Sequence, residues 1–348
     1  MMKIKLTALL LSLPCLLSLA CQRAPSTQNA GARVTDATGQ MVTVTDSSRI
    51  VSIGTSVTET IISLGARDRL VGVDDSSSEY LPEVAELPKV GPRTTLSAEG
   101  ILSLKPTLVI MTNDTGPPQV IEQLRGAGVT VLALSANYNV DAVKEKVRTI
   151  ARALKLDAQG ETLAHGIDLD MAEVAELQRQ VKSQPKVMFV GRGPNMPNAT
   201  MSGTGTTIDE MIRLAGGVNP MNSFQGFREM TDEAVVAAAP DVLLMTDKSF
   251  ERSGGIEGVL KFPGVALTPA GRDRRIVHVS DMYFQGFGPG VGHAIASLTF
   301  ALHPEVASPE MEAERGYMVR PDENKKAGSH RAGGDNTNAA ARPGAPKN

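Results

Sequence analysis

Between about residue 34 and residue 303, short apolar runs alternate with stretches in which apolar side chains recur every three or four positions. The runs are short enough for buried strands, and they lie at 50–53, 70–73, 108–111, 129–134, 186–190 and 276–279. The stretches with helical spacing lie at 57–64, 98–104, 118–126 and 292–302. Strands that alternate with helices in this way predict parallel, doubly wound sheets.

One element occurs twice in the chain. LSAEGILSLKPTLVIMT at 96–112 aligns without a gap with MTDEAVVAAAPDVLLMT at 230–246, an offset of 134 residues (233 − 99). In each copy a hydroxyl residue suited to an N-cap precedes a helix, and a glutamate falls in the first turn, where the helix dipole favours a carboxylate. Capping alone explains each acid separately. The matching positions of Glu99 and Glu233 predict two related lobes that each present a carboxylate from the same point.

A long helical pattern separates the two copies. Residues 140–181 contain no apolar run that fits a strand, and Gly160 and Gly166 are the points where a helix could bend. Such a helix between two α/β halves predicts a rigid spacer. The sequence therefore predicts two doubly wound, Rossmann-like α/β lobes joined by a long linker helix, with the N-terminal lobe at 34–138, the linker at 139–184 and the C-terminal lobe at 185–303.

The two ends of the chain differ from this folded region. Residues 1–20 contain two lysines, then an apolar run that ends in small residues, which is typical of a secretory signal peptide. Cys21 follows directly, as in a bacterial lipobox, although Ser18 stands where leucine is usual, so both lipidation and plain secretion are open. Residues 21–33 are predicted to be a tether. The composition changes from residue 304, and GSHRAGGDNTNAAARPGAPKN at 328–348 is rich in Gly, Ala, Asn and Pro with no hydrophobic period. Residues 304–348 are therefore predicted to be a disordered tail.

Composition narrows the class of function. The 348 residues carry a net charge of -3, no tryptophan and 3% aromatic residues, which argues against a nucleic-acid binder. Cys15 and Cys21 are the only cysteines, so the folded region has no disulfide or thiolate metal site. The five histidines are scattered, and SGTGT at 202–206 lacks the order of a catalytic or phosphate-binding motif. An exported binding protein, neither an enzyme nor a carrier of a prosthetic group, fits these features best.

Several stretches in this order resemble one family. They are RIVSIGTSVTETIISLGARDRLVGVD, LPKVG with LSAEGILSLKPTLVI, GPPQVIEQLRGAGVTVL, GTGTTIDEMIRLAGGVN, AAAPDVLLMT and LTPAGRDRRIVHVSDMYFQGFGPG. Together they resemble the class III periplasmic substrate-binding proteins of ABC importers, and most of all the bacterial haemin-binding branch. The resemblance implies an ABC permease and its ATPase as partners. It also implies that Glu99 and Glu233 are the two exposed glutamates that dock on arginines of the permease.

The ligand is expected at the carboxyl ends of the strands, where the loops of the two lobes face each other. The resemblance implies haemin as the transported ligand, and in the haemin-binding relatives a tyrosine after the VG of LPKVG coordinates the iron. Pro92 stands at that position here, and the family's arginine is displaced, with Arg93 one place early and Thr94 in its place. Because proline has no donor atom on its side chain, a ferric siderophore or cobalamin is the alternative cargo.

Three interpretations of the cleft remain open. Another side chain coordinates the iron, and the candidates are Tyr283 first, then Tyr80, Met196 and His165. Alternatively, cations on the mouth loops hold an anionic chelate or a corrinoid, and these cations are Arg93, Arg192, Arg228 and Lys248. In the third, haem lies on aromatic rings, those of Phe224, Phe227, Tyr283 and Phe284. The expected ligand-binding residues are Pro92, Arg93, Thr94, Arg192, Met196, Phe227, Tyr283 and Phe284.

Overall fold

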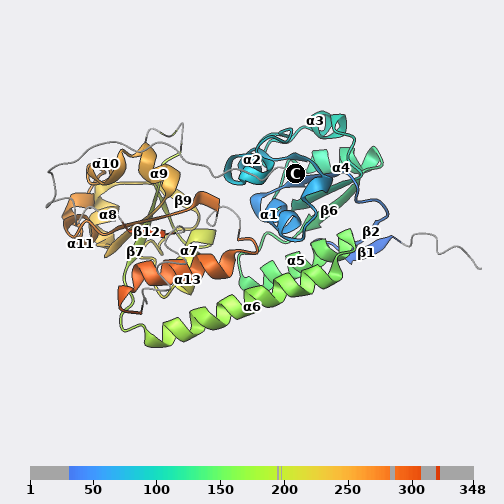
Figure 1. The fold of residues 1–348 in the computed structure, drawn as a ribbon. Helices are drawn as coiled ribbons and strands as arrows, with labels where there is room; N and C mark the ends of the chain where they lie inside the picture. The colour runs from blue at the N-terminus through green and yellow to red at the C-terminus, as the bar shows by residue number, and fades with distance from the viewer. Residues whose placement is uncertain (1–30, 194–195, 197, 283–286, 307–318, 322–348) are drawn as a thin grey trace, which may run out of the picture.

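The computed structural model describes residues 31–193, 196, 198–282, 287–306 and 319–321. Two α/β lobes stand side by side, and long helices run along one side of both (Figure 1). Within the described residues, the N-terminal lobe is built on a four-stranded sheet and the C-terminal lobe on a six-stranded one. The predicted architecture of two α/β lobes joined through a long helix is confirmed.

The sheet of the N-terminal lobe is entirely parallel, in the order β4-β3-β5-β6. Every residue of β3 and β5 is buried, because helices cover both faces of the sheet and an apolar cluster fills each face. The strands are β3 (Ile50–Ile53), β4 (Leu70–Val73), β5 (Leu108–Thr112) and β6 (Thr130–Leu134), and a hairpin of β1 (Ala32–Thr35) and β2 (Met41–Val44) precedes them. The helices are α1 (Thr55–Ser63), α2 (Asp75–Tyr80), α3 (Ala98–Ser103) and α4 (Pro118–Gly126), with short 3₁₀ turns at Arg67–Arg69 and Pro82–Val84.

The sheet of the C-terminal lobe has a parallel centre and antiparallel edges, in the order β12-β11-β10-β7-β8-β9. Its strands are β7 (Val187–Gly191), β8 (Thr200–Ser202), β9 (Phe227–Glu229), β10 (Val242–Thr246), β11 (Ile276–Val279) and β12 (Val319–Pro321). Its helices are α7 (Thr207–Leu214), α8 (Asp232–Ala238), α9 (Asp247–Arg252), α10 (Gly255–Val259), α11 (Pro269–Arg272) and α13 (Val291–Leu302), with 3₁₀ turns at Val265–Leu267 and Pro304–Val306.

The repeated element folds in the same way in both lobes. The helices α3 and α8 begin 134 residues apart, and β5 and β10 keep the same offset at both ends (242 − 108 and 246 − 112). Ser97 and Thr231 act as the N-caps, and each side chain accepts a hydrogen bond of 3.3 Å from the amide three residues on. At the other end, Lys105 and Ala239 take the left-handed conformation, with φ of 49° and 43°. The pattern of residues thus predicted a real structural repeat.

The linker consists of two helices, which corrects the prediction of one helical stretch over 140–181. The helix α5 (Val140–Leu154) ends where Lys155 adopts a φ of 59°, and α6 (Asp157–Gln180) returns alongside it. Gly160 does not bend the helix. A Cβ atom there would lie 2.4 Å from the Cβ of Ala151, so the glycine lets α6 approach α5 closely. The long connection between the lobes is therefore the 24-residue α6.

These two helices join the cores of both lobes. Val143 and Val147 of α5 pack in an apolar cluster of the C-terminal lobe, whereas Ile150 and Leu154 of the same helix pack in the N-terminal lobe. Leu163 of α6 contacts both clusters. Because each helix is anchored in both lobes, a large rotation of one lobe against the other would break apolar packing.

The end of the chain differs in part from the expected disordered tail. Residues 304–306 form a 3₁₀ turn, and β12 pairs antiparallel with β11 at the edge of the C-terminal sheet. The remainder of the predicted tail, residues 307–318 and 322–348, lies outside the described residues, as do the predicted signal peptide at 1–20 and most of the tether at 21–33.

Candidate ligand-binding cleft

The N-terminal lobe has a small polar pocket at the carboxyl ends of its strands. Its volume is about 70 Å³. Gly54, after β3, has a φ of 108°, and its amide donates to Asp74 Oδ1 at 2.9 Å, which ties the loops after β3 and β4 together. Side chains from the loops after β5 and β6 complete the wall. The lining residues are Gly54, Thr55, Ser56, Asp74, Ser76, Arg93, Thr112, Asp114, Ala136, Tyr138 and Lys146.

Arg93 lines this pocket, but a carboxylate already neutralises it. Arg93 donates to Asp114 Oδ2 at 2.6 Å, and Thr112 Oγ1 donates to Asp114 Oδ1 at 2.6 Å. Burial works to raise the pKa of Asp114, but the bonds from Thr112 and Arg93 outweigh it and hold that pKa below its usual value. Arg93 is therefore a weaker anion partner than its sequence position suggested. Pro92 and Thr94 are exposed beside it and do not line the pocket.

Lys146 of α5 also lines the pocket, and sequence reasoning did not select it. The side chain is buried, and Nζ donates to Ser56 Oγ at 3.0 Å. Burial lowers the pKa of Lys146 to about 8, and the nearby carboxylates of Glu59 and Asp114 limit that fall. A lysine in the middle of an amphipathic helix has the pattern of a solvated residue. Its burial follows only from the packing of α5 beneath the sheet.

Tyr138 is the aromatic residue at the mouth of the same pocket, and sequence reasoning missed it as well. It follows β6 and remains 36% exposed. Its ring meets Phe287 of the C-terminal lobe edge to face, with the centroids 6.3 Å apart. The signal that could have found it is its place four residues after a buried parallel strand, where ligand-binding loops gather.

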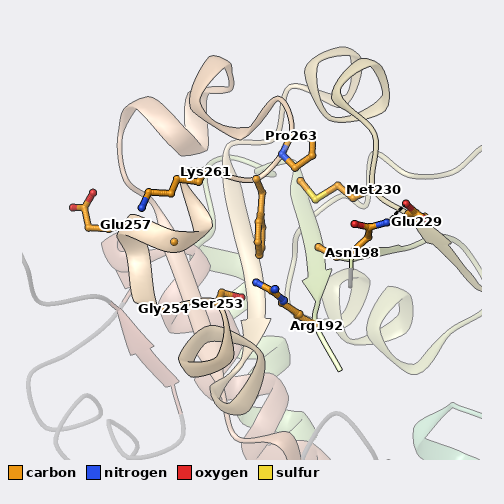
Figure 2. A pocket seen from close by; sticks show the side chains of 12 residues that line it. Arg192, Asn198, Glu229, Met230, Ser253, Gly254, Glu257, Lys261 and Pro263 are labelled. Atoms are coloured by element: carbon orange, nitrogen blue, oxygen red, sulfur yellow. Dashed lines mark hydrogen bonds between the residues drawn. The ribbon is translucent and has the colours of Figure 1, made fainter. Parts of the chain in front are cut away.

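A larger pocket lies in the C-terminal lobe, at the carboxyl end of β7. Its volume is about 610 Å³, and Figure 2 shows Arg192 reaching into it from one side. The guanidinium lies 5.9 Å from the centroid of the Phe262 ring, and the Arg192 amide donates to Ser249 Oγ at 3.0 Å. Asn198, which also lines the pocket, donates to Glu229 Oε1 at 2.5 Å. Lys261 and Arg192 have no ion pair with other described residues, so both cations are available to an anion.

The other residues predicted from the C-terminal lobe divide into three groups. Met196 and Phe227 are exposed, at 51% and 56%, and both lie on the segments that flank β8. Phe224 is buried, and Arg228 lies 4.7 Å from its ring centroid, so that ring serves the lobe core. Tyr283 and Phe284 lie outside the described residues.

Besides the Tyr138–Phe287 contact, polar groups of the two lobes meet at two further places among the described residues. Lys248 of α9 donates to Glu79 Oε1 of α2 at 2.8 Å, and its ammonium lies 4.4 Å from the Tyr80 ring. On the side of the linker, the amide of Gly290 at the start of α13 donates to Glu59 Oε1 at 3.0 Å. Burial raises the pKa of Glu59 to about 7, against the opposing effects of the Gly290 amide and Lys146.

The two candidate docking glutamates lie on the outside of the lobes. Glu99 in α3 and Glu233 in α8 are both exposed in the first turn of their helices. Figure 1 places α3 and α8 on different lobes, each away from α6. Neither glutamate has an ion pair within the part of the chain that the structure describes, so each presents a free carboxylate to solvent.

Two further features bear on the class of protein. Across the described ranges, no three His, Cys, Asp or Glu side chains gather as a metal site would require. None of the helices described combines the length and the apolar character that a membrane span requires.

The fold and the site define a two-lobed binding protein, and a family model agrees. The model described as "Periplasmic binding protein" matches residues 50–283. The chain belongs to this family of substrate-binding transport proteins, which serve ABC importers.

Individual relatives cover most of the chain. The periplasmic heme-binding protein RhuT from Roseiflexus sp. RS-1 is 40% identical, with a TM-score of 0.70 over 75% of this chain and 100% of that one. The ABC transporter substrate-binding lipoprotein YvrC of Bacillus subtilis (strain 168) is 27% identical over 78% of this chain and 85% of its own length. A cobalamin-binding protein of Halobacterium salinarum is also 27% identical, over 77% of this chain and 73% of its own length.

Proposed function

We propose that this protein captures haemin between its lobes and delivers it to the permease of an ABC importer. One observation carries the proposal: pockets open at the carboxyl ends of strands in both lobes. A tyrosine lies at the mouth of one pocket, and the other holds an arginine that has no ion pair among the described residues. Haemin needs a metal ligand, an aromatic or apolar floor and cations for two propionates. The likeness to RhuT, a heme-binding protein that the chain covers fully, supports the same cargo.

Pro92 stands where the haemin-binding relatives have an iron-coordinating tyrosine. Among the described residues, Tyr138 is the one best suited to coordinate the iron instead. Its ring is accessible, and it stands between the N-terminal pocket and the C-terminal lobe. Tyr80 suits that role poorly. Burial, Glu79 and Asp281 raise the pKa of Tyr80 to about 12, which disfavours the phenolate form that binds ferric iron. Tyr283, the first candidate from the sequence, lies outside the described residues and stays a candidate beside Tyr138, as do Met196, Phe227 and Phe284 for contact with the ligand.

Cobalamin is the second candidate cargo, and the state of Arg93 favours it. Because Asp114 neutralises Arg93, the N-terminal pocket offers less attraction to a dianionic ligand than its sequence suggests. The cobalamin-binding relative of Halobacterium salinarum supports this alternative. A ferric siderophore, which is the third candidate, would find two cations, Arg192 and Lys261, in the C-terminal pocket.

In this proposal Glu99 and Glu233 dock the loaded protein on the permease, whose ATPase drives transport. Charge-assisted pairs at both lobes would fix the orientation of the complex. The protein would act outside the cytoplasm, in the periplasm or at the cell surface. Cys21 would carry a lipid anchor, a role that the lipoprotein name of the Bacillus subtilis relative supports.

The test is a titration of the purified protein with haemin, followed at the Soret band, with cyanocobalamin and a ferric siderophore titrated in parallel by calorimetry. We expect saturable one-to-one binding of haemin with a shifted Soret band. Tyr138→Phe should alter the band and weaken binding by about tenfold or more, as loss of one strong polar contact does. Tyr80→Phe is the matched control and should leave the band unchanged. Heat from cyanocobalamin alone would move the proposal to a corrinoid cargo.

A further inference from the structure

The helix α9 of the C-terminal lobe reaches the helix α2 of the N-terminal lobe through one carboxylate. Lys248 Nζ lies 2.8 Å from Glu79 Oε1 and 3.4 Å from the Glu79 carbonyl oxygen. An Arg252 nitrogen lies 3.7 Å from the same Oε1. These are the helices of the two lobes that approach each other on the side away from α6 (Figure 1). A single acid therefore serves two cations of the opposite lobe.

The helix α9, which carries both cations, is held in place by contacts within the C-terminal lobe. The Lys248 amide donates to the buried carboxylate of Asp281 at 3.0 Å, and Thr246 caps α9 by accepting from the Ser249 amide at 3.3 Å. The Tyr80 ring of α2, in the N-terminal lobe, lies 4.4 Å from the ammonium and adds a cation–π contact. Positive charge at this place thus belongs to the architecture of the C-terminal lobe and does not depend on Glu79.

Another anion can replace the Glu79 carboxylate in its ion pairs with Lys248 and Arg252. The side chains of Lys248, Arg252 and Glu79 are 33%, 31% and 44% exposed, so water competes for all three charges. Ion pairs that are exposed to this degree contribute little to stability. A second anion that brings its own apolar contacts can therefore replace the Glu79 carboxylate at low cost.

We propose that Lys248 and Arg252 form an anion subsite beside the cleft, which Glu79 occupies in this structure and which a carboxylate of the cargo takes over. The inference rests on the proposed function, since it assigns a partner to a carboxylate of the haemin that the cleft would hold. Glu79 then acts as an internal competitor. The apparent affinity for cargo is then the intrinsic affinity multiplied by the fraction of molecules in which Glu79 has left the subsite.

The proposal predicts effects of opposite sign on the haemin Kd. Glu79→Gln removes the competing charge and should tighten binding about two- to fivefold, the range that an exposed ion pair allows. Lys248→Gln removes a charge-assisted partner of the cargo and should weaken binding by about tenfold or more. Glu83→Gln is the matched control, because it makes the same change of charge at an exposed position of the same lobe, and it should bind as the wild type does. Haemin dimethyl ester, which has no carboxylate, should bind equally to the wild type and to Glu79→Gln.

The outcomes separate the two proposals. A wild type that binds haemin, with Glu79→Gln binding no better, overturns the exchange and leaves the cargo assignment standing. That result would mean that Glu79 only clamps the lobes together, and Lys248→Gln and Glu79→Gln would then shift binding in the same direction. A wild type that binds no haemin overturns both, because the cargo then lacks the propionates that were to compete.

Discussion

Replacing Glu59 by glutamine should flatten the dependence of stability on pH between about 5.5 and 7.5. The Glu59 carboxyl lies between the lobes, where it accepts from the Gly290 amide at 3.0 Å, and burial raises its pKa from 4.5 to about 7. Because the folded-state pKa is the higher one, the folded protein favours protonated Glu59. Its contribution to stability is full below pH 4.5 and is lost as the pH rises through 7.

The magnitude follows from that shift. Each pKa unit corresponds to about 1.4 kcal/mol, so the whole change amounts to roughly 3 kcal/mol, of which about 2 kcal/mol falls between pH 5.5 and 7.5. Glutamine keeps the acceptor for Gly290 but does not titrate. Lys146, whose charge acts to lower the pKa of Glu59, has a pKa of about 8, and most of its own titration lies above this window.

The assay is urea unfolding of the wild type and of Glu59→Gln at both pH values. The wild type should lose about 2 kcal/mol more than the variant on going from pH 5.5 to pH 7.5. Glu122→Gln, at an exposed position of α4, is the control and should retain the wild-type slope. Parallel slopes for the wild type and Glu59→Gln would refute the argument, because they would mean that water reaches the carboxyl and leaves its pKa near 4.5.

Three further predictions concern the repeat, the linker and docking. Ser97→Ala and Thr231→Ala should each lower the free energy of unfolding by roughly 1 kcal/mol, measured by urea unfolding, and a loss at only one of them would contradict the equivalence of the two caps. Lys155→Gly should raise the free energy of unfolding by roughly 0.5–1 kcal/mol, and with it the thermal midpoint, because glycine adopts a φ of 59° without strain. A lower midpoint would show that the contacts of the Lys155 side chain outweigh its backbone strain. Glu99→Arg combined with Glu233→Arg should abolish uptake in cells and leave the Kd for cargo unchanged, and uptake at the wild-type rate would refute their docking role.

The strands and the repeat could be predicted from the sequence because their signals are local. A run such as LVIMT must be buried on both faces, and the structure buries every residue of β5 and of its counterpart β10. The caps at Ser97 and Thr231 were equally readable, since capping involves only the next three residues. The break at Lys155 was not readable, because a lysine in the left-handed conformation has no sequence signal and the turn depends on the packing of α6 against α5.

In the candidate site, too, local features could be predicted from the sequence and long-range contacts could not. The sequence by itself determined which loops follow the carboxyl ends of the strands, and it therefore predicted that Arg93, Arg192 and Lys248 lie at the mouth of the cleft. Only the tertiary structure decided their chemical state. Arg93 is neutralised by Asp114, Arg192 lines a pocket without an ion pair to any described residue, and Lys248 pairs with Glu79 of the other lobe. The physical reason is the distance along the chain between the residues that interact. Secondary structure depends on neighbours along the chain, whereas the charge that a side chain offers to a ligand depends on which distant groups the fold brings to within a few ångströms.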